Sequence, residues 1–558
     1  LDMNVLMSAA VTGAAILGDY PEAAAVMVLF AISEALESRA MNRTRAAVEK
    51  LLSLAPDTAL VLDDGRWREM DVQLVKPGAI ILVRPGERIA CDGVVRQGRS
   101  SVNQAPITGE SMPVDKAPGD TVFAGTLNGV AALEIQVTAE ASDSTLARIV
   151  RSVEEARGAR APIERFVDAF SRWYTPAIFL LAVLAALIPP LLFSSPWKAS
   201  IYTGLVILVT GCPCALVIST AVSVVSGLAA AAHSGMLVKG GLFLEQGRRL
   251  SLIALDKTGT ITSGIPCQTD CILLDASEPA EFLAAALASC SDHPVSAAIA
   301  RHAAEAGLIL PQVREFGAIP GQGICGIING RKYYLGNKVL AGRLGADTPE
   351  LRRQREALEA QGRTTAALYG EEKAFCLFGV ADAVRESSRQ AIRELHELGV
   401  KTVMLTGDNT LVAQRIAAET GIDDVRGELM PEDKLKEISR LAAEPGALIG
   451  MVGDGINDAP ALARAQIGFA MARGGTDTAI ETANVALMDD DLRKVPRFIR
   501  LSRATWGIMI QNIVFALGIK SVFLALTFAG QATMWMAVFA DVGTTLIVVA
   551  NALRILKK

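Results

Sequence analysis

The chain has 558 residues, which is too many for one ordinary domain. Hydrophobic residues make up 51% of it and charged residues 20%, and the apolar residues collect in long runs, which excludes an ordinary soluble protein and favours several membrane spans. The net charge of −5 gives no sign of a nucleic-acid partner, and the eight scattered cysteines indicate a reducing cytosol rather than a disulfide framework.

The chain begins with two apolar segments that we expect to be membrane helices. Residues 3–17 are alanine-rich, and residues 23–32 follow after a short polar turn. Glu34 and Glu37 continue the second helix, and the arginines after them place that end on the cytoplasmic side. The sequence starts at Leu1 without a signal peptide, so we expect a truncated or processed N-terminus.

Residues 51–150 predict a small β-rich soluble domain. Short β-branched runs alternate there with Pro-Gly and Asp-Gly turns. In one turn, Gly109 suits a sharp bend that would present Glu110 outward on a loop. Taken alone, this pattern also fits an ordinary turn with a solvated glutamate.

Residues 173–193 and 201–232 predict the third and fourth spans, with Pro189-Pro190 in the short loop between them. The fourth span contains Cys212-Pro213-Cys214. On an unbroken helix the two cysteines would point roughly 200° apart, but Pro213 can unwind the helix, free the Val209 carbonyl and bring both sulfurs to one side. Paired thiolates favour Cu(I), Zn²⁺, Cd²⁺ or Pb²⁺, and the alternative is two small packing residues at a kink.

Three apolar runs in the following soluble region each end in a polar turn. They precede Asp256, Thr406 and Asp454. The helical segments between them predict a parallel sheet with helices on both faces, so these strand ends would meet at one edge. Asp256 is then a candidate nucleophile for a phosphoryl group, in a turn rich in hydroxyls and glycine, although a lone aspartate there could simply cap the loop.

Clustered carboxylates at that edge repel one another unless a cation joins them. Mg²⁺ takes oxygen ligands, so Asp256 and Asp454 are the expected ligands. Lys434 could neutralise the oxygens of a transferred phosphoryl group. No Walker-type phosphate loop is present, so a nucleotide would be held in another way.

An insertion at residues 265–378 is long enough to form its own domain. In it, His293 could stack on an adenine ring, and Gly321 and Gly323 would allow close approach to the backbone. A helix cap and an ordinary turn explain these residues equally well.

Two last apolar segments, residues 507–529 and 533–550, bring the expected spans to six. They contain Lys520 and Asp541, and ionisable groups inside a membrane usually face a partner or a pathway. A carboxylate added to two thiolates suits a divalent ion better than Cu(I). Lys520 could pair with Asp541 when the metal site is empty, and the alternative is a structural ion pair alone.

The stretch Asp256-Lys257-Thr258-Gly259-Thr260, the other strand-end motifs and the Cys-Pro-Cys segment together resemble the P-type ATPases, ion pumps with a haloacid-dehalogenase-like core. The resemblance covers essentially the whole chain and implies a multidomain α/β membrane protein. The implied parts are transmembrane helix pairs at residues 1–50, 151–248 and 496–558, a β-rich actuator domain at 51–150, a haloacid-dehalogenase-like phosphorylation domain at 249–264 and 379–495, and an α+β nucleotide-binding domain at 265–378.

The resemblance also implies roles for single residues. ATP would phosphorylate Asp256, Thr258 would supply a backbone oxygen to Mg²⁺, and Glu110 would orient the water that hydrolyses the aspartyl phosphate. His293 would lie in the nucleotide site, although Asp292 replaces the glutamate usual before it. The other matched positions are Thr406 for the phosphate, Asp408 on the nucleotide side, and Asp454, Asn457 and Asp458, which complete the pocket.

Lys520 and Asp541 resemble the zinc/cadmium/lead subgroup of the heavy-metal (subclass IB) P-type ATPases. We therefore expect a monomeric exporter of Zn²⁺, Cd²⁺ or Pb²⁺ in the lipid bilayer of a prokaryotic plasma membrane, with its soluble domains in the cytoplasm. Cys212, Cys214 and Asp541 would hold the ion, and Glu34 or Glu37 would assist its release. The alternatives are a Cu(I) exporter and a membrane-anchored phosphatase or metal sensor that does not transport. Family members often carry two further helices and a metal-binding domain before the first helix, and neither is in this sequence.

Overall fold

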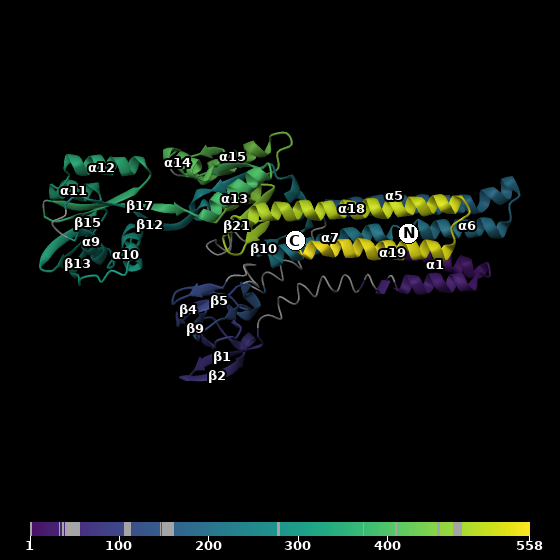
Figure 1. Cartoon of the computed structure of the whole chain (residues 1–558), viewed down its shortest axis with the longest axis horizontal. Helices are drawn as coiled ribbons and strands as arrows, with labels where there is room; N and C mark the ends of the chain where they lie inside the picture. The colour runs from purple at the N-terminus through teal and green to yellow at the C-terminus, as the bar shows by residue number, and fades with distance from the viewer. Residues whose placement is uncertain are drawn as a thin grey trace. The chain divides into compact units, whose positions relative to one another are not determined.

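The computed structural model of the chain divides into two compact units, each described by itself (Figure 1). The first holds Leu1–Arg249, Asn484–Asp489 and Arg497–Lys558, and the second holds the remainder. The structure describes residues 3–32, 34–35, 38, 56–104, 113–145, 147, 161–275, 279–371, 373–407, 410–454, 458–471 and 482–557.

Apolar helices make up much of the first unit. Within the described residues, four helical stretches are long and apolar enough to cross a membrane, whereas the first two expected spans are shorter apolar helices. The short helices are α1 (Met3–Ile16) and the helix Tyr20–Ile32. The long ones are α5 (Pro162–Phe193), α6 (Trp197–Thr210) with α7 (Cys214–His233), α18 (Lys494–Phe528) and α19 (Met534–Leu553).

The loop predicted to begin at Pro189-Pro190 is wrong. Helix α5 continues through both prolines to Phe193, because a φ of about −65° is compatible with helical backbone. The turn comes at Ser194, which has a left-handed φ of 52° and donates its backbone N–H to the Pro189 carbonyl. Residues 189–193 are therefore helical, and the loop before α6 is shorter than predicted.

The β-rich part of the first unit contains two antiparallel sheets. Buried side chains alternate along the strands, as in Leu133, Ile135 and Val137, and this alternation explains why the segment forms strands. The larger sheet has the order β2-β1-β3-β9-β4-β7 and the smaller one β6-β5-β8. Their strands are β1 (Thr58–Asp63), β2 (Arg66–Asp71), β3 (Ile80–Val83), β4 (Gly93–Gln97), β5 (Ser100–Asn103), β6 (Val114–Lys116), β7 (Thr121–Val122), β8 (Leu127–Asn128) and β9 (Leu133–Val137). The first unit also contains the antiparallel pair β10 (Met236–Val238) and β22 (Val485–Leu487).

In the second unit, five strands lie in the order β21-β20-β11-β18-β19, and each neighbouring pair is parallel. After β11 the chain builds one side of the sheet and then the other, so β11 is the topological switch point. The strands are β11 (Leu252–Asp256), β18 (Lys401–Leu405), β19 (Asp424–Arg426), β20 (Ile449–Gly453) and β21 (Ile467–Met471). The accompanying helices are α13 (Glu386–Glu397), α14 (Thr410–Thr420), α15 (Pro431–Ala442) and α16 (Ala459–Arg464).

The insertion after β11 forms a separate antiparallel sheet in the order β12-β17-β16-β15-β14-β13. The chain leaves along β12 and returns along β17, and Thr262 pairs with Val384 at their junction. The strands are β12 (Thr262–Leu273), β13 (Arg314–Ile319), β14 (Gly323–Ile328), β15 (Arg331–Gly336), β16 (Thr364–Tyr369) and β17 (Ala374–Val384), with helices α9 (Ala280–Ala288), α10 (Pro294–Glu305), α11 (Lys338–Leu344) and α12 (Pro349–Ala360).

Candidate active site

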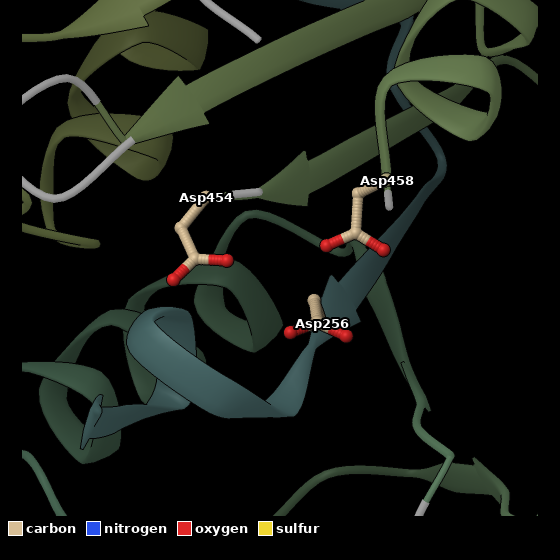
Figure 2. A group of neighbouring side chains, drawn as sticks. All are labelled: Asp256, Asp454 and Asp458. Carbon is tan, nitrogen blue, oxygen red and sulfur yellow. The ribbon is translucent and has the colours of Figure 1, made fainter. Parts of the chain in front are cut away.

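Three carboxylates meet at the carboxyl edge of the parallel sheet. Asp256 ends the central strand β11, Asp454 follows β20, and Asp458 precedes α16. Figure 2 shows the three side chains around one small space, and one oxygen from each lies within 4.8 Å of the others. The strand-end prediction therefore placed these residues correctly relative to one another.

Lys434 joins this group from the first turn of α15. Its Nζ contacts Asp256 Oδ1 and lies 2.8 Å from Asp458 Oδ1. Lys434, Asp256 and Asp458 are all buried. With all groups ionised, three carboxylates face one ammonium and leave an excess of two negative charges.

Burial and the excess negative charge raise the pKa of two of the acids. Burial and the neighbouring Asp458 raise the pKa of Asp256 to about 7, against the opposing pull of Lys434. Burial and Asp458 likewise raise the pKa of Asp454 to about 6. The raised pKa values show that these acids are too crowded to ionise easily without a cation. Their oxygen donors and excess negative charge suit Mg²⁺.

We expect Mg²⁺ to raise the melting temperature of the chain more at about pH 8 than at about pH 5.5. Because the pKa of each acid is higher in the folded state, folding binds protons, and metal-free stability falls as pH rises from about 4 to about 7. Mg²⁺ offsets the repulsion between the carboxylates, and this repulsion exists only where the acids are ionised. Thermal unfolding with and without Mg²⁺ measures the effect, and Asp454→Asn should shrink the difference. Equal Mg²⁺ shifts at both pH values would contradict it.

The turn after β11 brings its backbone against Asp454. Gly259 has a left-handed φ of +72°, and a Cβ added to it would lie 1.7 Å from Asp454 Oδ2. Only glycine therefore fits here, both for its backbone conformation and for the space it leaves. The glycine fixes how closely the turn approaches the acidic group.

Gly259→Ala is expected to lower the phosphorylation predicted for Asp256 by at least about a hundredfold. Asp454 must move away by more than an ångström, and misplacements of about 1 Å cost that much in catalysis. Phosphate incorporation from labelled ATP measures it. Gly399→Ala is the matched control, since Gly399 has a φ of +73° with nothing within 4 Å of its added Cβ, and so carries the same backbone strain without the clash. Equal losses in both variants would leave backbone strain as the whole effect.

Arg385 also contacts this turn, and the sequence analysis did not identify it. Its guanidinium donates to the carbonyls of Gly259 at 3.1 Å and Thr262 at 3.0 Å. The hydroxyl of Thr260 is buried and has no hydrogen-bond partner among the described residues. The only sequence signal for Thr260 was its position in the Asp-Lys-Thr-Gly-Thr stretch. A phosphoryl oxygen would be a suitable acceptor for its hydroxyl.

The remaining predicted phosphate residues are only partly described. Thr406 is buried directly after β18, and its N–H donates to the Arg426 carbonyl at 3.0 Å. Thr258 follows β11 in extended backbone, with φ −76° and ψ 131°. Glu110, Asp408 and Asn457 lie outside the described residues.

A cavity of about 420 Å³ lies in the inserted domain and is lined by His293, Gly321 and Gly323. His293 also caps α10, because its Nδ1 accepts the Val295 N–H at 3.3 Å. The capping and pocket interpretations of this histidine are therefore compatible. Gln322 lines the same cavity with a buried Oε1 that has no partner among the described residues, and sequence reasoning had not singled it out.

The Cys-Pro-Cys segment breaks the fourth span. Helix α6 ends at Thr210 and α7 begins at Cys214. Cys212 and Cys214 are buried and joined as a disulfide, so both sulfurs lie on one side of the break. A soft metal ion would require the same two side chains as thiolates.

Lys520 and Asp541 lie close to this break and pair with each other. Lys520 Nζ is 2.7 Å from Asp541 Oδ1 and 3.3 Å from the Thr210 carbonyl oxygen. The prediction of a free Val209 carbonyl is wrong, because Cys212 donates its N–H to it at 3.3 Å. Of the two candidate release acids, Glu34 is exposed and Glu37 lies outside the described residues.

Fold and site together define a membrane-anchored phosphoryl-transfer enzyme. The haloacid dehalogenase-like hydrolase family matches residues 250–466, and the P-type ATPase actuator domain matches residues 53–154. The chain is 47% identical over 564 residues to a "probable cadmium-transporting ATPase" of Alkalihalophilus pseudofirmus, with all of this chain and 78% of that protein covered. It is 43% identical over 558 residues to the "zinc/cadmium/lead-transporting P-type ATPase" of Escherichia coli, with 100% and 75% covered.

A solved structure gives the same result. A zinc-transporting PIB-type ATPase in the E2.Pi state matches with a TM-score of 0.68 and 41% identity, over 100% of this chain and 90% of that chain. The chain belongs to the P-type ATPase family. The family expected from the motifs and the multidomain α/β membrane fold are confirmed.

Proposed function

We propose that this chain uses ATP to export Zn²⁺, Cd²⁺ or Pb²⁺ through a phosphorylated Asp256. The observation that carries the proposal is the broken span at Cys212 and Cys214, with Lys520 and Asp541 paired beside it. Ionisable groups inside a membrane usually mark an ion pathway, which favours transport over a phosphatase or sensor that does not transport. The relatives named for cadmium, zinc and lead transport support the same choice.

Asp256 acts as the nucleophile on the terminal phosphorus of ATP. One of its carboxylate oxygens bonds to phosphorus, the bond to the bridging oxygen breaks, and ADP leaves. Lys434 already contacts Asp256 and donates to the oxygens of the transferred group, and the Thr406 and Thr260 hydroxyls lie on the adjoining turns. Mg²⁺, held by Asp256, Asp454 and the Thr258 backbone oxygen, would supply charge stabilisation.

Hydrolysis of the aspartyl phosphate resets the pump. We assign the positioning of the attacking water to Glu110. The assignment is supported by the match of residues 53–154 to the P-type ATPase actuator domain. Asp408 and Asn457 complete the nucleotide and phosphate contacts in this proposal.

Cys212, Cys214 and Asp541 bind the exported ion. Two thiolates with one carboxylate carry three negative charges, which match a divalent ion better than Cu(I). When the ion leaves, Lys520 neutralises Asp541, as the 2.7 Å contact illustrates. We assign the chain to a prokaryotic plasma membrane, and its bacterial relatives support this assignment. In the proposal it works as a monomer with its soluble domains in the cytoplasm.

ATP hydrolysis by the full chain in lipid vesicles, measured against a panel of metals, tests the proposal. Zn²⁺, Cd²⁺ and Pb²⁺ should stimulate the wild type, and Asp541→Ala should remove that stimulation. Best stimulation by Cu(I), retained in Asp541→Ala, would identify a copper exporter. Hydrolysis that does not depend on Cys212 and Cys214 would point to an enzyme that does not transport.

We also place the adenine of ATP in the cavity lined by His293. His293→Ala is expected to raise the KM for ATP by about tenfold with little change in kcat, because a stacking contact of about 1.4 kcal/mol serves binding rather than chemistry. His302→Ala, on the same helix α10, is the control. Steady-state hydrolysis at varied ATP measures both constants, and an unchanged KM would remove His293 from the nucleotide site.

A further inference from the structure

A cationic side chain lies over a tryptophan ring where helix α18 begins its apolar part. The guanidinium carbon of Arg248 is 3.7 Å from the centroid of the Trp506 ring. Arg248 belongs to the single turn Gly247–Arg249, which directly follows helix α8 (Gly241–Gln246). Neither Arg248 nor Trp506 takes part in the transport cycle described above.

Close packing fixes this turn against α18. A Cβ added to Gly247 would lie 2.5 Å from a ring carbon of Phe498, so a larger residue would push the turn away from the helix. At the end of α8, the Leu244 carbonyl accepts a hydrogen bond from the Ser502 hydroxyl, one turn before Trp506. The position of Arg248 over the ring is therefore set by buried contacts of its neighbours.

The exposed side chains of α18 change character at Trp506. Arg503, which precedes it by one turn, is exposed. Ile510 and Val514 follow it by one and two turns and are also exposed, and further exposed apolar side chains continue along the helix. Tryptophan is enriched where the apolar membrane core meets the headgroups, and arginine extends its charged end toward the headgroups. The stacked pair therefore lies at the level of the lipid headgroups.

The protein leaves the Arg248 guanidinium without an anionic partner. Within the part of the chain that the structure describes, this side chain forms no hydrogen bond or ion pair, and its Nε is buried. Glu245, three positions earlier, instead uses Oε2 to accept the Ile163 N–H at 3.0 Å. Stacking covers one face of the guanidinium and leaves the two Nη groups at its edge. A phosphate matches such a pair of donors with two of its oxygens.

We propose that Arg248, stacked on Trp506, binds the phosphate of an anionic phospholipid. The Nη groups would donate to the phosphate oxygens, and the acyl chains would lie along the exposed apolar face of α18. Arg249 and Arg503 are exposed close to this point, and their positive charge favours an anionic over a zwitterionic headgroup. The leaflet is the cytoplasmic one, a statement that rests on the orientation proposed above.

The test measures how tightly the full chain holds phosphatidylglycerol in a nonionic detergent, without ATP or Zn²⁺. Labelled lipid that migrates with the chain in gel filtration gives the affinity, and phosphatidylcholine should bind more weakly. Arg248→Gln should lower the affinity for phosphatidylglycerol by about tenfold, because it removes the charge and both Nη donors. Arg497→Gln is the matched control, since Arg497 is exposed on α18 but farther from its apolar part, and it should bind as the wild type does.

Two further variants keep the test decisive if Arg248→Gln does not fold. Arg248→Lys keeps the charge without the planar pair of donors, and Trp506→Leu keeps an apolar side chain without the stacking. Each should lower the affinity for phosphatidylglycerol by at least about threefold.

Three results would overturn the proposal. The first is wild-type affinity in Arg248→Gln or in both further variants. The second is an equal loss in Arg248→Gln and Arg497→Gln, which would show that general charge attraction holds the lipid. The third is displacement of phosphatidylglycerol by an equal concentration of inorganic phosphate, which would show a site for free phosphate. None of these results bears on ATP-driven export, because neither ATP nor the transported ion is present.

Discussion

Asp256→Asn is expected to abolish stable phosphorylation of the chain and to lower ATP hydrolysis by at least roughly 10⁴-fold, as the loss of a covalent nucleophile does in other enzymes. The amide keeps the size of the side chain and its place at the end of β11. It does not, however, supply the anionic oxygen that bonds to phosphorus. Acid-stable incorporation of label from ATP, followed by hydrolysis rates, measures both effects.

Asp424→Asn is the matched control for this variant. Asp424 lies in β19 of the same sheet, but it is exposed and pairs with Arg426 at 2.8 Å. Exposed ion pairs contribute about 0–1 kcal/mol, so phosphorylation should be unchanged. Label that persists in Asp256→Asn at the wild-type level would place the phosphorylated residue elsewhere in the chain.

Cys212→Ala is expected to lower Zn²⁺-stimulated hydrolysis and vesicle transport by more than about a hundredfold. Removing a residue that only hydrogen-bonds to a metal ligand lowers metal affinity or activity by about 10–100-fold, and Cys212 is proposed as a direct ligand. Phosphorylation of Asp256 by inorganic phosphate, with Mg²⁺ but without Zn²⁺, should persist, because that reaction needs only the site at the sheet edge. The two measurements together separate loss of the ion site from loss of folding.

Cys290→Ala serves as the control, since this cysteine is exposed in the inserted domain. Its Zn²⁺ stimulation should equal that of the wild type. Full Zn²⁺ stimulation in Cys212→Ala, with transport intact, would show that the ion does not bind at the break between α6 and α7.

The sequence predicts the acidic site well because parallel strands end on a common edge. Any fold that places β18 and β20 beside β11 brings Asp256 and Asp454 together. The contact between Gly259 and Asp454 is not predictable in this way, since it depends on the left-handed turn and on where the chain leaves β20. Arg385 lies 126 positions from Gly259, and no local pattern marks it as a partner of that turn.

The membrane segments are predicted less evenly. The proline at Pro213 correctly predicts a break, since α6 ends at Thr210 shortly before it. The prolines at Pro189 and Pro190 wrongly predict one, because α5 continues through both. Likewise, proline removes a hydrogen-bond donor, but the structure shows that the Thr210 carbonyl is the one that Lys520 reaches.

The junction where Thr262 pairs with Val384 makes the inserted domain separable from the parallel sheet. The insertion begins at Thr262 in β12 and ends at Val384 in β17, and these two residues are paired in one antiparallel ladder. Everything between them could be excised and the ends rejoined by a tight two-residue hairpin, with β11 and its neighbours left in register. The parallel sheet is complete without the insertion, so the insertion could change in length and sequence without altering the pairing of the parallel strands.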